Sequence, residues 1–291
     1  MQTLLRLLLS CFAKLPLRLI HLLGTALGVA ITLFAGKFLQ RIQENLRQSG
    51  VCADEAIFKQ TVQQNIKESG KAILETFAIW FRDYDKLKPW FAGCSGWEHV
   101  ESALAEGKGL IFLTPHLGCF EITSLYYAQF QPIAVLFRPP RQPWLLPLIY
   151  AGRQRGKVAL APANAHGIKQ LLQALKRGEA VGILPDQAPL EGEGEWAPFF
   201  DKAAYTMTLA SKLAQKTGAQ VLMAFGERLP HGGGYHIHIR PITAGGIATP
   251  SQLNSEVERT IGQCPAQYVW MYDRYKVRAE SRIKLESAPP N

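Results

Sequence analysis

The stretch Gly109-Leu110-Ile111-Phe112-Leu113-Thr114-Pro115-His116-Leu117-Gly118-Cys119-Phe120-Glu121 decides the fold expected for this chain. Five apolar or β-forming residues run into Pro115, and Glu121 opens a new segment with apolar periodicity. A strand, a tight turn and a helix are therefore expected in succession, with His116 and Glu121 at the junction.

Histidine and glutamate at such a junction suit acyl transfer to an alcohol. A neutral imidazole takes a proton from a hydroxyl near neutral pH, and a carboxylate on its other nitrogen fixes the tautomer. We expect His116 to be the base and Glu121 its partner. Backbone N–H groups near Gly118, at the helix start, are expected to face a developing oxyanion. The alternative is a histidine that only caps the helix.

Strands and helices alternate along the rest of the chain. Helices are expected at 98–106, 118–130, 143–155, 167–177 and 204–216, and strands at 109–114, 132–137, 158–161, 180–185, 219–225 and 235–241. This alternation predicts an α/β fold with a mostly parallel sheet flanked by helices. The segment 188–203 is expected to be a long loop, whose Trp196, Phe199 and Phe200 wall an acyl chain or rest on a membrane.

Three predicted strands end in charged or ionisable residues, namely His116, Arg138 and Asp186. Ligands of such sheets bind at the carboxyl ends of the strands, so these side chains are expected to converge on one site. Arg138 is expected to bind a phosphate or a carboxylate, and Asp186 to order Arg138 or contact the acceptor. The alternatives are a structural ion pair for Arg138 with Asp186 or Glu121, and a loop cap for Asp186. Further cations near this rim are expected to be solvated: Arg141, Arg153, Arg155 and Lys157.

The first 43 residues differ from the rest, because they contain five basic residues and no acidic one. Residues 19–36 are uncharged and would rise about 27 Å as a helix, close to the thickness of a bilayer core. We therefore expect a membrane anchor over 1–43, either spanning or deeply interfacial, followed by a catalytic domain over 44–291. The alternative is a buried core helix. Gly24 and Gly28 hint at helix pairing, and His21 is expected to reach toward the interface.

Composition limits the partners. The 32 basic residues outnumber the 23 acidic ones, which favours anionic phospholipids, phosphorylated glycolipids or an acidic carrier protein. Nucleic acid is not expected, because no zinc-finger or RNA-binding signature accompanies the charge. Five scattered cysteines indicate a reducing compartment, and Cys119 is expected to be an apolar filler rather than a nucleophile. His236 and His238 lack a third ligand at a usual spacing, so no metal or other cofactor is expected.

Several motifs in this order resemble one family. They are HLGCFE at 116–121, FRPP at 137–140, ILPDQ at 183–187, APFF at 197–200 followed by Thr206, and CPAQYVWMYDRYK at 264–276. Together they resemble the late acyltransferases of lipid A biosynthesis, within the wider glycerolipid acyltransferase group marked by His-x-x-x-x-Asp/Glu. The likeness extends from the N-terminal apolar segment to about Lys276.

This resemblance implies a bacterial inner-membrane enzyme whose site faces the cytoplasm. It implies transfer of a fatty acyl group from acyl carrier protein to a hydroxyl of a lipid A precursor. His116 would be the general base and Glu121 its partner, with Arg138 and Asp186 in the other charged blocks. Two alternatives stay open: a phospholipid or glycolipid acyltransferase that uses acyl-coenzyme A, and a membrane-tethered lipid-binding protein without turnover.

Overall fold

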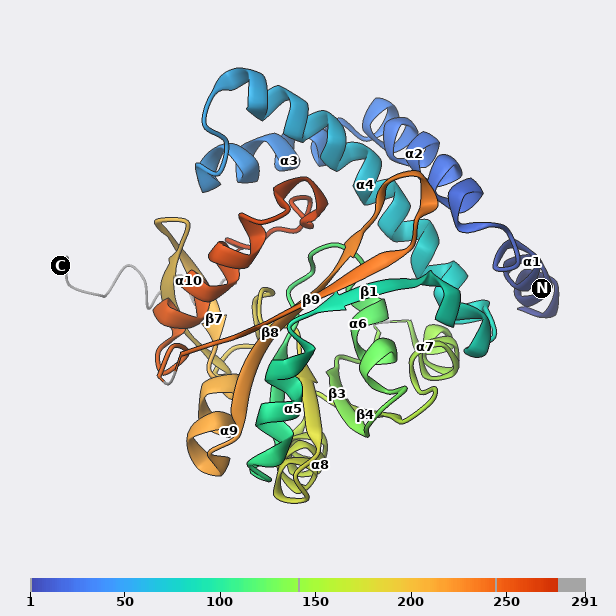
Figure 1. The fold of residues 1–291 in the computed structure, drawn as a ribbon. Helices are drawn as coiled ribbons and strands as arrows, with labels where there is room; N and C mark the ends of the chain where they lie inside the picture. The colour runs from blue at the N-terminus through green and yellow to red at the C-terminus, as the bar shows by residue number, and fades with distance from the viewer. Residues whose placement is uncertain (1, 141, 244, 277–291) are drawn as a thin grey trace.

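The computed structural model describes residues 2–140, 142–243 and 245–276, so Arg141 lies outside the described residues. Seven strands form one sheet in the order β1-β9-β8-β2-β5-β3-β4, and two more form a separate hairpin (Figure 1). The strands are β1 (Phe91–Ser95), β2 (Leu110–Leu113), β3 (Ile133–Phe137), β4 (Val158–Pro162), β5 (Ala180–Ile183), β6 (Gly194–Phe199), β7 (Lys202–Met207), β8 (Gln220–Arg228) and β9 (Tyr235–Pro241).

Helices cover both faces of the sheet and extend beyond its edge. They are α1 (Gln2–Phe12), α2 (Leu17–Phe34), α3 (Gly36–Ser49), α4 (Glu55–Phe81), α5 (Trp97–Ala105), α6 (Phe120–Tyr127), α7 (Leu146–Arg153), α8 (Ala165–Lys176), α9 (Leu209–Thr217) and α10 (Pro250–Ile261). Short 3-10 helices are η1 (Asp85–Trp90), η2 (Pro143–Leu145), η3 (Pro230–Gly232) and η4 (Pro265–Gln267).

The predicted α/β fold with a mostly parallel sheet is confirmed. Strands β2, β3, β4, β5 and β8 run parallel to one another, and β9 pairs with β8 in the antiparallel sense. Side chains alternate along β2, so that Ile111 and Leu113 belong to the core under α8, α9 and α10, while Leu110 and Phe112 belong to the core under α5 and α6. The carboxyl ends of β2, β3 and β5 therefore share one edge, as the sequence predicted.

One predicted helix was placed to start too early, and one predicted loop was wrong. Residues 204–207 are part of β7 rather than of a helix, and β7 pairs with β6 across the segment expected to be a loop. A two-residue turn joins the strands, in which Phe200 and Asp201 both have positive φ. Phe199 and Phe200 are buried in the core against the C-terminal segment and do not line the cavity described below. Strand β1 and helix α10 were not predicted.

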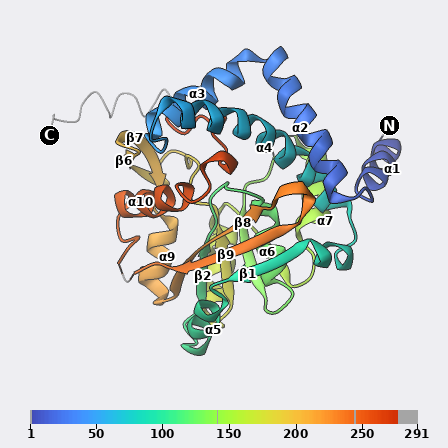
Figure 2. The same ribbon diagram turned by 45° about the horizontal axis from the view of Figure 1, so that its top comes forward.

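Helix α2 packs along α4 on the outside of the domain (Figure 2). Glycine makes this approach close: a Cβ on Gly28 would lie 2.1 Å from the carbonyl oxygen of Ile66, and one on Gly70 would lie 2.0 Å from that of Gly24. The predicted pairing through Gly24 and Gly28 thus occurs within the chain. The expectation for His21 was wrong, because its side chain is buried between α2 and α4. Helix α3 runs through the predicted boundary at residue 43, which stays a prediction.

Candidate active site

His116 lies in the loop that follows β2, directly above the neighbouring strand β5. Its Nδ1 is 2.9 Å from Oδ1 of Asp186, and its backbone N–H donates to Oδ2 of the same carboxylate at 2.9 Å. Asp186 follows β5 and is buried. Burial alone raises the pKa of Asp186, but the charge and hydrogen bonds of His116 outweigh it and lower that pKa. An ionised carboxylate therefore holds the ring.

The other ring nitrogen points to the cavity. Nε2 of His116 lies 3.2 Å from the side-chain amide nitrogen of Gln187, which donates if Nδ1 carries the proton toward Asp186. The Phe120 ring lies 4.7 Å from the imidazole, centroid to centroid. If Nδ1 carries the proton, the lone pair of Nε2 lies at the cavity wall beside Gln187.

Glu121 has other partners than the sequence predicted. Arg153 of α7 donates to both of its carboxylate oxygens, with Nε to Oε2 at 2.9 Å, and Trp80 of α4 donates to Oε2 at 3.2 Å. The first turn of α6 directs this side chain toward α4 and α7, while Asp186 approaches His116 from the neighbouring strand. The carboxylate that contacts the imidazole is thus Asp186, and Glu121 lines the same cavity beside it.

Gly118 is structural in this geometry. Its N–H donates to the carbonyl of Gln267 at 3.0 Å, and the N–H of Cys119 donates to that of Gly226 at 2.7 Å. These two N–H groups are therefore bonded to backbone carbonyls, and the oxyanion contact expected for the N–H groups near Gly118 stays a prediction. A Cβ at position 118 would lie 2.0 Å from the carbonyl oxygen of Gly226, and φ is +61°, so only glycine fits.

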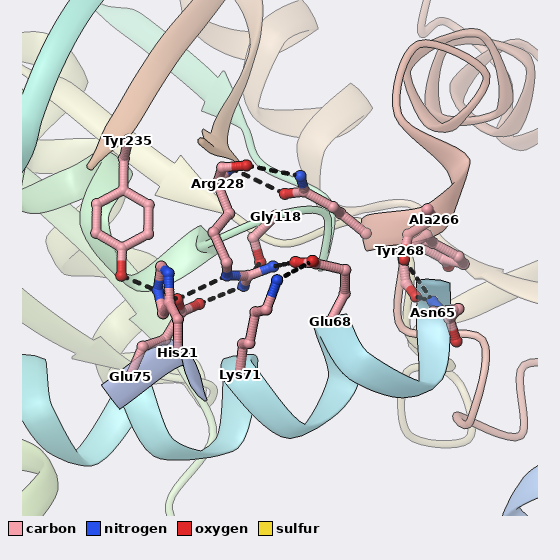
Figure 3. A network of polar contacts seen from close by, with 11 residues as sticks. His21, Asn65, Glu68, Lys71, Glu75, Gly118, Arg228, Tyr235, Ala266 and Tyr268 are labelled. Carbon is pink, nitrogen blue, oxygen red and sulfur yellow. Dashed lines mark hydrogen bonds and ion pairs between the residues drawn. The ribbon is translucent and has the colours of Figure 1, made fainter. Parts of the chain in front are cut away.

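A buried ionic cluster holds the same loop from behind (Figure 3). Arg228 forms a two-pronged ion pair with Glu75 and also donates to Glu68 at 2.6 Å and to the carbonyl of Gly118 at 3.3 Å. Tyr235 donates to Glu75 at 2.9 Å, and Nε2 of His21 lies 3.4 Å from the same carboxylate. Burial raises the pKa of Glu75, but Arg228 and His21 lower it to about 2.

The end of β8 is further fixed by Gln267. Its side-chain oxygen accepts from the N–H of Arg228, and its side-chain nitrogen donates to the carbonyl of Arg228, both at 2.9 Å. Because the backbone carbonyl of Gln267 also accepts from Gly118, one residue connects the ionic cluster to the catalytic loop. The loop therefore has little freedom to move relative to α4.

A cavity of about 790 Å³ opens at this edge of the sheet and includes His116, Glu121 and Gln187 in its wall. Arg138 lines it as well, and its guanidinium lies 3.7 Å from Glu193, a different partner from the two weighed in the sequence. The remaining cations in the wall are Arg153, Lys212, Lys216 and Lys276. Most of the lining is apolar, so the cavity suits an alkyl chain with a charged group at its mouth.

A missing side chain in one row across the sheet leaves space for this cavity. Leu222, Phe112, Gly182, Val135 and Leu160 stand in register across five neighbouring strands, and only Gly182 lacks a side chain. The cavity reaches past this row to Trp97, whose ring packs on Tyr126, Tyr127 and Phe130. Gly182 and Trp97 both line the apolar interior of the cavity.

Other candidate groups have structural contacts. Cys119 is buried, and burial raises the pKa of its thiol well above the usual value. The thiol therefore stays protonated and packs as a small apolar side chain. His236 contacts Ser95 at 2.7 Å, and His238 contacts Glu227 at 2.8 Å. In the described parts of the chain, no group of three or more His, Cys, Asp or Glu side chains is placed to hold a metal ion.

Sequence reasoning missed three residues of this site. Arg153 was expected to be solvated, yet it holds Glu121. Gln187 follows Asp186 and could have been found from that neighbour alone, because a strand end often carries its ligands in consecutive positions. Arg228 gave no signal, since its partners Glu68 and Glu75 lie about 150 residues earlier in the chain.

Comparison with known proteins assigns the chain to a family. The sequence model of the bacterial lipid A biosynthesis acyltransferases matches residues 3–277. The chain belongs to this family. It is 26% identical over 273 residues to the lipid A biosynthesis lauroyltransferase of Escherichia coli K12, covering 92% of this chain and 88% of that protein. It is also 26% identical over 285 residues to the palmitoleoyltransferase of lipid A biosynthesis from the same organism, covering 94% and 90%.

A third relative is a lipid A biosynthesis acyltransferase of Haemophilus influenzae, 28% identical over 191 residues that cover 64% of this chain and 59% of the relative. Membership in the lipid A acyltransferase family confirms the resemblance stated from the motifs. The protein is therefore an acyltransferase, and the site around His116 is the place to look for its chemistry.

Proposed function

We propose that the protein transfers a fatty acyl chain from acyl carrier protein to a hydroxyl group of a lipid A precursor. One observation carries the proposal: an imidazole hydrogen-bonded to an ionised carboxylate opens into a deep apolar cavity, in a chain of the lipid A acyltransferase family. A general base and a space for an alkyl chain are the two parts that such a transfer needs.

In the proposed mechanism, Nε2 of His116 removes the proton of the acceptor hydroxyl. The hydroxyl oxygen attacks the carbonyl carbon of the donor thioester, an ester bond forms, and the carbon–sulfur bond breaks. The imidazolium then returns the proton to the leaving thiolate. Asp186 stabilises the imidazolium through Nδ1, a role supported by the 2.9 Å contact. Gln187, 3.2 Å from Nε2, has to give way to the hydroxyl or share it.

Glu121 acts in this proposal through Arg153. Their hydrogen bonds fix the guanidinium in the cavity wall, close to the catalytic imidazole. Burial lowers the pKa of Arg153, but Glu121 outweighs that effect and raises it, so the guanidinium stays charged. A fixed positive charge in the wall suits an acceptor phosphate or the developing negative charge of the transition state.

The rim of the cavity supports an anionic donor and acceptor. Arg138, Lys212, Lys216 and Lys276 line it, and Glu193, which pairs with Arg138, is the acidic exception beside Glu121. With a net charge of +9, the chain attracts both an acidic carrier protein and a phosphorylated glycolipid. We place the enzyme at the bacterial inner membrane, with its catalytic domain on the cytoplasmic face, where such a carrier is available.

Lipid A from cells lacking the gene provides the test, with mass spectrometry as the readout. Complementation with the parent should restore one secondary acyl chain, and complementation with His116→Ala should not. We expect the purified variant to lose about a thousandfold in turnover, the range for removal of a general base. Unchanged lipid A on deletion would indicate a phospholipid or glycolipid acceptor. Restoration of the acyl chain by His116→Ala would indicate a lipid-binding role without turnover. A preference of the purified enzyme for acyl-coenzyme A over acyl carrier protein would identify acyl-coenzyme A as the donor.

A further inference from the structure

Exposed apolar side chains are concentrated at the N-terminal end of the chain. Among the described residues, nine of the thirteen exposed large apolar side chains precede residue 40, so they are concentrated on the N-terminal helices. Five of them define what we call the outer face of α2: Leu19, Leu22, Leu23, Val29 and Leu33.

The opposite face of α2 packs against the rest of the protein. Leu17, Ile20, His21, Gly24 and Gly28 are buried, and they recur at the three- and four-residue spacing of one helix face. Glycine brings the backbones of α2 and α4 into contact, as described above. The helix thus has one apolar face against α4 and one apolar face that stays exposed among the residues the structure describes.

Both ends of α2 are attached to the same domain. Before it, the carbonyl of Leu15 accepts from Arg82 at 2.6 Å, and Leu17 is buried. After it, Asn45 of α3 donates to the carbonyls of Trp270 and Tyr272 at 2.7 and 2.9 Å. Ile42 and Leu46 of α3 lie in the main core. A helix that crosses a bilayer has its ends on opposite sides, which these contacts do not allow.

We propose that α2 lies in the plane of the membrane and inserts its outer face into one leaflet, instead of spanning the bilayer. By length and composition α2 is the one described helix that qualifies as a membrane span, yet 28% of it is buried inside the protein. Exposed cations flank it at both ends, namely Lys14, Arg18, Lys37 and Arg41, and the first acidic residue is Glu44. Such flanks fit anionic phospholipid headgroups at one surface.

This inference rests on the proposed membrane location of the enzyme. It adds a geometry to that proposal: the buried face of α2 reaches the ionic cluster through His21 and Glu75, so the catalytic domain sits directly on the leaflet. A lipid-anchored acceptor would then reach the site from the same leaflet without leaving the membrane.

Topology provides the decisive test. In a Cys11→Ser background, Lys14→Cys and Lys37→Cys place single exposed thiols before and after α2. Intact spheroplasts and inside-out membrane vesicles are treated with a membrane-impermeant maleimide, with the background protein as the blank. We expect both positions to react in the same preparation. Reaction of one position in spheroplasts and of the other in inside-out vesicles would show a span and overturn the inference.

Vesicle binding tests the outer face itself. Full-length protein is mixed with vesicles of phosphatidylglycerol and phosphatidylethanolamine, and bound protein is measured by flotation. Leu22→Gln with Leu33→Gln should weaken binding at least tenfold, because two exposed apolar contacts are lost. The control is Ile57→Gln, which replaces an exposed apolar side chain on α4 and should leave binding unchanged.

Two results would overturn this part. Unchanged vesicle binding in the double variant would show that the outer face does not contact lipid. Loss of self-association in the double variant, measured by analytical ultracentrifugation, together with unchanged vesicle binding, would assign the face to a second copy of the chain. Lipid A analysis of the same strains reports on the acyltransferase function separately, so the two proposals fail independently.

Discussion

Two ionic groups hold the loop after β2 from opposite sides, and they differ in exposure. His116 faces the cavity with 16% of its side chain exposed, and Asp186 lies fully buried behind it, while Arg228 and Glu75 lie behind the loop with 1% and 2% of their side chains exposed. The first pair leaves Nε2 of His116 at the cavity wall, where Gln187, 3.2 Å away, is the group that a substrate hydroxyl would displace. The second pair leaves no group open and fixes the carbonyl of Gly118. We infer that the open pair performs chemistry and the closed pair provides stability.

The largest expected effect is on the closed pair. Arg228→Met leaves the Glu75 carboxylate buried without its partner, and we expect the free energy of unfolding to fall by about 3–5 kcal/mol. Urea denaturation measures this loss of stability. The matched control is Arg240→Met, which breaks a more exposed pair with Glu256 and should cost about 1 kcal/mol or less. Equal losses in the two variants would remove the distinction between buried and exposed pairs.

The acid sensitivity of the protein should follow from the same pair. The pKa of Glu75 is lowered from 4.5 to about 2, so its contribution is fully present above pH 4.5 and is lost as the pH falls toward 2. The contribution is on the order of 3 kcal/mol. Melting temperatures of the parent and Glu75→Gln, recorded from pH 6 to pH 2, should converge at the acid end. Parallel curves would show that this carboxylate does not determine the acid response.

The open pair should respond in activity rather than in stability. Asp186→Asn removes the charge that stabilises the imidazolium, and we expect turnover to fall about a hundredfold at little change in melting temperature. A double-mutant cycle with Arg153→Met separates the two carboxylates. Glu121→Gln should be non-additive with Arg153→Met because those side chains are bonded, whereas Asp186→Asn should be additive. Additive effects for Glu121→Gln and non-additive effects for Asp186→Asn would indicate that Glu121, not Asp186, orients His116.

The smallest expected effect concerns donor choice. A Cβ at Gly182 would make ordinary contacts of 3.4 Å or more with Val135 and Ile133, so Gly182→Ala should fold and place a methyl group in the cavity. Excluding one to two methylene groups should shift the ratio of kcat/KM toward shorter donors by about tenfold. Ala134→Val, on the other face of the sheet, is the control. Equal loss with every donor would mean that the residue acts only on packing.

Much of the fold followed from local sequence. Periodicity predicted the bounds of β2, β3, β4 and β5 to within a few residues. Each of these strands is a short apolar run between turn residues, a pattern that can be read from neighbouring residues alone. The hairpin of β6 and β7 was missed, because Phe200 and Asp201 carry none of the glycine or asparagine signals typical of a two-residue turn. The helix predicted over 204–216 began too early for the same reason.

The sequence by itself determined the alternation of strands and helices, the apolar helix near the N-terminus, and the three strand ends that carry His116, Arg138 and Asp186. These features depend on residue type and spacing alone. Only the tertiary structure decided which carboxylate meets His116, since β5 lies beside β2 although 70 residues separate the side chains. It also decided that α2 has both ends on one domain. Strand order and helix packing depend on contacts between distant segments, which no local pattern records.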